Sequence, residues 1–166
     1  MTSNERIAYF NGEFVPESQV VIPFRDRGFL LGDAVFDTAR TFAGKVFKLR
    51  EHVERLFRSL KYMDIDPGLS IDDFVRISEE VIERNRHFLS ADGDYWVTQR
   101  ITRGPNVVGG DLWQSEGPTI IVECTPLPLK SRAHLFRDGI DVIFPSMRRV
   151  SPDSLSPNVK SHNYLN

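Results

Sequence analysis

The feature that most constrains the fold is a change in the spacing of apolar residues partway along the chain. Residues 33–42 alternate in character and are rich in β-forming residues, which favours a strand. After residue 49 the spacing becomes that of one helix face, with apolar side chains at Val53, Leu56, Phe57 and Leu60. The order of these periods predicts strands, then helices, then strands, which is an α+β arrangement and not an alternating parallel one.

Turn residues divide the first half of the chain. Asn11-Gly12 favours a tight hairpin between two short strands in residues 7–15, because both positions tolerate positive φ. The tripeptide 43–45 is expected to turn the chain into a further strand over 46–49. The first helix should end before Asp66-Pro67-Gly68. A second helix should start at Ser70 with Asp73, carrying an apolar face made of Phe74, Ile77, Val81 and Ile82.

The second half is expected to hold two more strands of the same domain, over 95–102 and 119–124, joined by a Gly- and Pro-rich loop over 103–118. Pro126 and Pro128 then indicate a linker. The predicted organisation is a small α+β domain over 1–125, a linker over 126–133, and the start of a second domain over 134–166, with a strand over 139–144. About 40 residues are too few for a domain, so the sequence is interpreted as truncated.

Composition excludes several classes of function. Of 166 residues 40% are hydrophobic, and the formal net charge of −2 gives no electrostatic case for binding nucleic acid or an anionic membrane. The single cysteine, Cys124, allows no internal disulfide or thiolate metal site and is expected in the core. No stretch approaches the ~18 apolar residues of a membrane span, and the polar residues 1–6 do not resemble a signal peptide. A cytoplasmic protein is expected.

Four basic residues are candidates for chemistry when the residues are considered alone. Lys160 could form a Schiff base with an aldehyde, although most lysines are merely solvated. Arg55, beside the apolar face of the first helix, could bind a phosphate, but the simpler expectation is a surface pair with Glu51 one turn earlier. Arg103 closes a strand before the Gly-rich loop, where a ligand-binding cation or a solvated arginine is equally expected. Arg100 precedes it on the same strand.

Four stretches together resemble the class IV aminotransferases, the fold type IV pyridoxal-phosphate enzymes. Residues 26–37, DRGFLLGDAVFD, look like the block DRGxxxGDGVFE, with Ala34 and Asp37 departing from it. Residues 51–56, EHVERL, look like the helix motif HxxRL. Residues 101–104, ITRG, are similar to VTRG of D-amino-acid aminotransferases, and residues 159–166, VKSHNYLN, look like the segment of the cofactor lysine. The four occur in order across most of the chain.

The resemblance implies a role for each matching residue. Lys160 would form the Schiff base with pyridoxal 5'-phosphate and then move the substrate proton. Arg55 would hold the cofactor phosphate, and Tyr164 would approach the cofactor. The implied substrate-binding residues are Phe36, Arg100 and Arg103, the last of them at a carboxylate. His52 is expected to make a structural hydrogen bond near the start of the helix.

The resemblance also implies a larger molecule. Class IV enzymes take further cofactor contacts from the domain that follows the lysine, so this chain alone is expected to be incomplete for activity. They act as dimers, and the loop 105–113 with Trp113 would reach toward the neighbouring subunit. The chain is thus expected to be the small domain of a fold type IV enzyme plus the start of the larger domain.

The expected reaction is amino-group transfer between an amino acid and a 2-oxo acid. The substrate could be a branched-chain L-amino acid or a D-amino acid; the ITRG stretch leans toward the latter. Two alternatives stay open at this point. One is the aminodeoxychorismate lyase branch of the same family, which eliminates pyruvate, and the other is a non-catalytic fragment.

Overall fold

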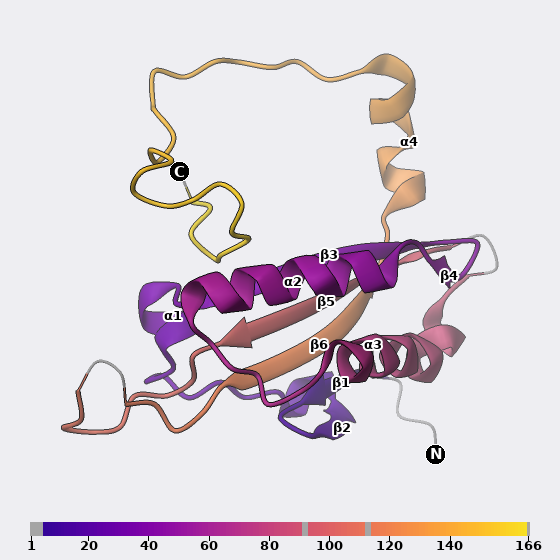
Figure 1. The fold of residues 1–166 in the computed structure, drawn as a ribbon. Coiled ribbons are helices and arrows are strands. Elements are labelled where there is room, and N and C mark those ends of the chain that lie inside the picture. Colours follow the sequence, from indigo (N-terminus) through magenta and orange to yellow (C-terminus); the bar gives the residue numbers. More distant parts are fainter. Residues whose placement is uncertain (1–4, 91–92, 112–113, 166) are drawn as a thin grey trace.

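A computed structural model describes residues 5–90, 93–111 and 114–165 of the chain, and within them the fold is α+β, as predicted. A six-stranded antiparallel sheet has the order β2-β1-β6-β5-β3-β4 (Figure 1). Strands β1 and β6 are neighbours in this order although they are far apart in the sequence. Their pairing therefore brings the two ends of the domain together. The strands are β1 (Ile7–Phe10), β2 (Glu13–Pro16), β3 (Ala34–Phe42), β4 (Lys45–Val46), β5 (Tyr95–Thr102) and β6 (Thr119–Pro126).

Two amphipathic helices, α2 (Leu49–Met63) and α3 (Ile71–Asn85), bury their apolar faces against one face of this sheet (Figure 1). Alternate residues of β3, β5 and β6 complete that core, as expected for strands with one covered face. Shorter helical elements are α1 (Arg27–Leu31), α4 (Leu129–Asp138), and the 3₁₀ turns η1 (Glu17–Gln19) and η2 (Arg86–Phe88). None of the described helices is long and apolar enough to cross a membrane.

Several local predictions are confirmed. Asn11 and Gly12 both have positive φ in the β1–β2 hairpin. Ser70 and Asp73 form a reciprocal capping box at the start of α3. Cys124 is a buried core residue, and burial raises the pKa of its thiol to about 12, so it is unreactive at neutral pH.

Two predicted strands are wrong. The strand expected over 46–49 is only β4, because Lys48 takes a left-handed conformation and Leu49 already begins α2. Residues 139–144 form no strand, although their sequence is apolar. A strand needs a neighbour for its backbone hydrogen bonds, and the described residues supply none there; Phe144 is 96% exposed. Helix α4 begins inside the predicted linker 126–133, and the proposed domain boundary stays a prediction.

The end of the chain returns to the sheet. After α4 the chain arches away from the sheet, and the C-terminal residues come back beside α1 and α2 (Figure 1). Ser161 pairs antiparallel with Val35, at the end of β3 that β4 does not cover. The backbone N–H of Phe36 donates to the Lys160 carbonyl (3.0 Å), and that of His162 donates to the Ala34 carbonyl (3.0 Å). The segment 160–162 therefore extends the edge of the sheet.

Packing of α2 onto β3 is expected to dominate the stability of this domain. Leu56 is fully buried in the shared core, so Leu56→Ala should lower the free energy of unfolding by about 2–5 kcal/mol through lost burial and the cavity left behind. Urea unfolding followed by circular dichroism measures this. Lys61→Ala on the exposed face of the same helix is the control and should change stability by less than about 0.5 kcal/mol. Equal effects of the two changes would contradict the packing described here.

Candidate active site

Three of the predicted site residues form a row across neighbouring strands. Phe36 on β3 is paired with Arg100 on β5. The Val35–Ser161 bridge places Lys160 opposite Phe36 on the other side of β3. Residues in such register project to the same side of a sheet. Lys160, Phe36 and Arg100 are therefore brought together on the face opposite α2 and α3.

The backbone of Lys160 is fixed by groups from two elements. Its N–H donates to the Ser59 hydroxyl (3.1 Å), and its carbonyl accepts from Phe36. Ser59 lies fully buried on α2, one turn after Arg55, and its hydroxyl donates to the Arg55 carbonyl (3.3 Å). The preceding Val159 is packed into the core. The position of the lysine thus depends on main-chain contacts, while its side chain is left to project into the site.

The Lys160 amine lies against aromatic rings. Its Nζ is 3.9 Å from the centre of the Phe36 ring and 5.2 Å from that of Tyr164. Burial lowers the pKa of Lys160; Arg55 and Arg100 act in the same direction, whereas Asp37 opposes them. A lowered pKa increases the fraction of neutral amine, which is the form that attacks a carbonyl.

Arg55 is oriented by an aspartate that the sequence analysis did not assign. Its Nε and one Nη donate to the two carboxylate oxygens of Asp37 at 2.6 and 2.7 Å, a bidentate pair. The carboxylate is fully buried, whereas the Arg55 side chain is 44% exposed. Nδ1 of His52 lies 2.8 Å from the same carboxylate. Burial acts to raise the pKa of Asp37, but hydrogen bonds from Arg55 and His52 outweigh it, and the pKa is lowered.

These contacts test two expectations about residues of α2. The simple surface pair of Arg55 with Glu51 is wrong, since Arg55 pairs with Asp37 and Glu51 lies near Lys48 (3.9 Å). His52 does make a structural hydrogen bond, as expected, but its side chain bonds across to β3 instead of along the helix start.

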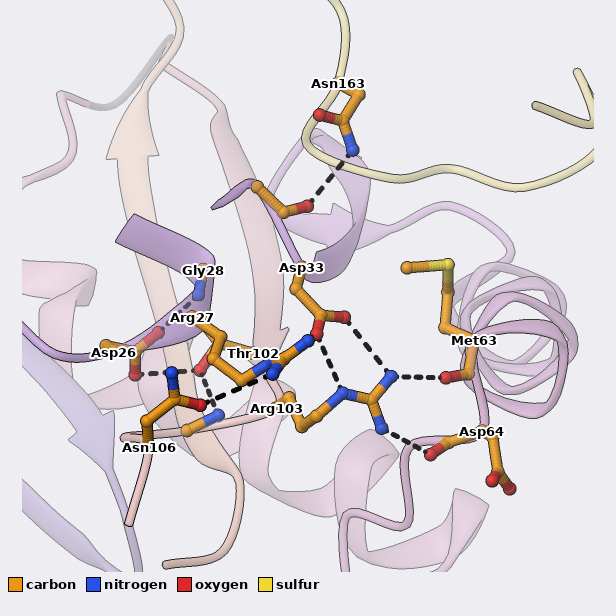
Figure 2. A network of polar contacts seen from close by, with 12 residues as sticks. Asp26, Arg27, Gly28, Asp33, Met63, Asp64, Thr102, Arg103, Asn106 and Asn163 are labelled. Carbon is orange, nitrogen blue, oxygen red and sulfur yellow. Dashed lines mark hydrogen bonds and ion pairs between the residues drawn. The ribbon is translucent and has the colours of Figure 1, made fainter. Parts of the chain in front are cut away.

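Arg103 belongs to a different set of contacts, drawn in Figure 2. Its guanidinium donates to both carboxylate oxygens of Asp33 (2.7 and 3.3 Å) and to the carbonyls of Met63 (2.6 Å) and Asp64 (2.8 Å) at the end of α2. A cation at the C-terminal carbonyls of a helix is a stabilising arrangement. All three guanidinium nitrogens are engaged, and the structure does not bring Arg103 to Lys160. Its substrate role stays a prediction that these contacts do not favour.

The DRG part of the first motif holds the sheet and α1 together. The Asp26 carboxylate accepts from the Gly28 amide (2.7 Å) and from the hydroxyls of Thr102 (2.8 Å) and Thr119 (2.6 Å). A Cβ at Gly28 would collide with the Thr102 side chain. Asn163 donates to the carbonyl of Gly32 (3.2 Å), at the end of α1 (Figure 2). This motif therefore anchors the segment that follows the lysine.

Tyr164 and the loop over 105–113 are the remaining predicted positions. The Tyr164 ring packs edge-to-face on Phe36 (5.8 Å between centres), and so does the His162 ring. These residues form the Lys160 cluster, which consists of Lys160, Phe36, Arg100, His162 and Tyr164. The backbone of the loop turns back on itself with Asn106 bridged to Ser115. Trp113 lies outside the described residues. No cluster of metal-binding side chains occurs in the part of the chain that the structure describes.

Three residues of the site were missed by sequence reasoning: Asp37, Ser59 and His162. Asp37 carried a signal, because a charged residue at a helix-facing position of a strand requires a buried partner. Ser59 and His162 carried none, since their importance comes from contacts between distant parts of the chain.

Comparison with known proteins identifies the family of the chain. The family model described as amino-transferase class IV matches residues 34–166, which include Phe36, Arg55 and Lys160. The chain belongs to the class IV aminotransferases. The match begins at the start of β3 and spans every residue of the Lys160 cluster.

Two kinds of relative are similar to this class IV chain. A Methanocaldococcus jannaschii protein provisionally named branched-chain-amino-acid aminotransferase is 37% identical over 158 residues, 95% of this chain and 52% of that protein. A D-alanine aminotransferase of Staphylococcus aureus is 32% identical over 78 residues, 47% of this chain and 28% of that protein. The chain thus spans about half the length, or less, of the curated relatives it matches.

Solved structures share the fold. The branched-chain amino acid aminotransferase of Escherichia coli superposes with a TM-score of 0.83 at 23% identity, over 95% of this chain and 52% of that one. The branched-chain aminotransferase of Thermoproteus uzoniensis with norvaline gives 0.76 at 20% identity over the same shares. A third branched-chain amino acid aminotransferase, complexed with N-(5'-phosphopyridoxyl)-L-glutamate, superposes with a TM-score of 0.63 at 19% identity. The match covers 72% of this chain and 40% of that one. These confirm the expected fold of the N-terminal half.

The Asp37 pair should make stability depend on pH. A carboxyl with a lowered folded-state pKa contributes stability above its unfolded pKa of about 4, and loses it as pH falls through the folded value. Asp37→Asn should therefore reduce the loss of stability below about pH 4 and cost about 1–3 kcal/mol at pH 7, where Arg55 loses a charged partner. Urea unfolding across this pH range measures both. Asp72→Asn, at an exposed pair with Arg50, is the control; the same profile in both variants would contradict the role of Asp37.

Proposed function

We propose that the protein of which this chain is part transfers amino groups between an amino acid and a 2-oxo acid, with pyridoxal 5'-phosphate held at Lys160. The observation that carries the proposal is a partly buried amine with a lowered pKa, beside aromatic rings and near the Arg55 guanidinium. Family membership supports it, and so does the phosphopyridoxyl compound named for one of the structurally similar aminotransferases.

The donor set fits this cofactor. Lys160 supplies an amine, the Phe36 and Tyr164 rings supply flat apolar surface, and Arg55 supplies a cation for the phosphate. The pair with Asp37 uses Nε and one Nη of Arg55, and leaves the other Nη without a partner among the described residues. When bound, the cofactor supplies an aldehyde that condenses with amines and a conjugated ring that accepts an electron pair.

Each residue then has a separate task. Lys160 would hold the aldehyde through Nζ, and its amine would hold and return the proton at the substrate Cα. Asp37 orients Arg55, and the depressed pKa of its carboxyl keeps it charged at neutral pH. Phe36 excludes water from the amine. Arg100, whose guanidinium lies 5.7 Å from the centre of the Phe36 ring, contributes positive charge on the substrate side.

A homodimer is also proposed. Large apolar side chains of the segment before α1 and of α1 itself are exposed in this chain, namely Val21, Ile22, Phe24, Phe29, Leu30 and Leu31. Such a patch is typical of an interface, and a second subunit could cover it. A cytoplasmic location and the absence of nucleic-acid or membrane partners remain proposals from composition.

The names of the relatives suggest two classes of substrate. A relative that matches 95% of this chain is named for branched-chain amino acids, and one that matches 47% is named for D-alanine. Amino transfer is favoured over the lyase reaction, because both kinds of relative are named as aminotransferases. Assaying pyruvate release against transfer to a 2-oxo acid separates the two reactions.

Covalent labelling tests the lysine. Adding pyridoxal 5'-phosphate, reducing with borohydride and mapping the peptides should place the label on Lys160, whose amine has the lowered pKa. Exposed lysines such as Lys61 provide the internal comparison. A label spread evenly over the lysines, or concentrated on another one, would overturn the site.

Affinity for the cofactor tests Arg55. Arg55→Ala should weaken binding of pyridoxal 5'-phosphate by about 1.5–3 kcal/mol, the range for a lost hydrogen bond to a charged group. Titration followed by tryptophan fluorescence measures it, and pyridoxal without phosphate is the matched ligand, whose affinity should change little. Arg58→Ala on the same helix is the control variant. An equal loss for both ligands would mean that Arg55 acts on the fold and not on the phosphate.

A further inference from the structure

The Lys160 cluster contains a buried polar atom that nothing in the described chain satisfies. Nε2 of His162 is covered, and it has no hydrogen-bond partner in the described residues. Buried polar atoms of native proteins are almost always paired, because an unpaired one costs about 1–3 kcal/mol. An exception that lies inside a site calls for a partner outside the chain.

The ring is placed where a ligand of Lys160 would lie. His162 follows Lys160 by two residues in an extended segment, so both side chains project to the same side. Its ring packs edge-to-face on Phe36, with 5.2 Å between centres, and its backbone is fixed by Ala34. Lys160, His162 and Arg100 therefore surround one ring, that of Phe36.

The charges around the imidazole favour an anion. Burial lowers the pKa of His162, and Arg100 and Lys160 lower it further, so the ring is neutral at physiological pH and keeps one N–H to donate. Two acidic groups lie beside this cluster: Asp37, which binds Arg55, and Glu123, which is 3.4 Å from Arg100. Burial raises the pKa of Glu123 even though Arg100 opposes this. Three cations, Lys160, Arg55 and Arg100, therefore face one charged carboxylate and one carboxyl whose ionisation is disfavoured.

We propose that His162 is a substrate-binding residue that donates from Nε2 to the carboxylate of the amino acid or 2-oxo acid, beside the Arg100 guanidinium. The inference rests on the proposed function and names its carboxylate subsite. It also moves that subsite away from Arg103, whose nitrogens are engaged by Asp33 and by the end of α2. A carboxylate at this place would satisfy the unpaired nitrogen and offset the surplus of positive charge.

A pair of small aldehydes tests this without the cofactor. Glyoxylate carries a carboxylate and acetaldehyde does not; each condenses with a lysine amine, releases water, and is fixed by hydride from cyanoborohydride. The ratio of the two labelling rates at Lys160, divided by the ratio at exposed Lys61 in the same digest, reports carboxylate binding beside Lys160. The pKa of the amine affects both aldehydes equally and cancels from the ratio.

The variants separate a binding role from a structural one. His162→Leu should lower the normalised ratio about 10-fold, the loss of one hydrogen bond to a charged group, while the melting temperature stays the same or rises because the unpaired nitrogen is gone. His162→Gln keeps an N–H donor and should recover part of the ratio. His87→Leu, at an exposed histidine, is the control and should leave the ratio unchanged.

Three results would be decisive. A ratio that falls in His162→Leu and partly recovers in His162→Gln supports the subsite. A normalised ratio near one in the unmodified protein, or one unchanged in His162→Leu, overturns it while leaving the reactive lysine intact. Labelling of Lys160 no faster than Lys61 with either aldehyde would mean that the proposed function itself fails.

Discussion

The site depends on the pairing of residues 160–162 with the exposed end of β3. Two backbone hydrogen bonds of 3.0 Å and the Ser59 contact join parts of the chain that lie about a hundred residues apart. Closing so long a loop costs conformational entropy that these few bonds must offset with help from the buried Val159. Because the pairing is through the backbone, it fixes the register of Lys160 against Phe36, and a slip of one residue would turn the amine to the other face.

Two arginine–aspartate pairs show how one motif serves both fold and site. Asp33 and Asp37 come from the same stretch, one just before β3 and the other within it, and each binds an arginine at two oxygens. Arg103 is also held by two carbonyls and is only 20% exposed. Arg55 keeps free donor capacity and is more exposed. The two arginines differ in the number of their partners. All three guanidinium nitrogens of Arg103 are engaged, which ties β5 to the end of α2, whereas one Nη of Arg55 has no partner among the described residues.

The sequence was sufficient for elements whose stability is local. The hairpin at Asn11-Gly12 and the helix start at Ser70 follow from backbone preferences of those residues, and the helix that carries Val53 to Leu60 follows from its period. The strand over 139–144 failed because apolar character indicates burial, whereas a strand also requires a neighbour. Lys160, Arg55 and Phe36 were predicted as site residues from the resemblance. Asp37 was missed although its place on a strand carried a signal, and His162 became visible only when register and burial placed it beside those residues.

The Phe36 ring has two opposed effects on the lysine beside it. An ammonium 3.9 Å from the ring centre is attracted to the aromatic face, by about 0.5–2 kcal/mol in proteins, which favours the charged form. The same ring helps to bury the amine, and burial favours the neutral form. The pKa of Lys160 is lowered, first by burial and further by Arg55 and Arg100, while the charge of Asp37 acts in the opposite direction. Burial and the two guanidinium groups therefore favour the neutral amine, and contact with the Phe36 face favours the ammonium.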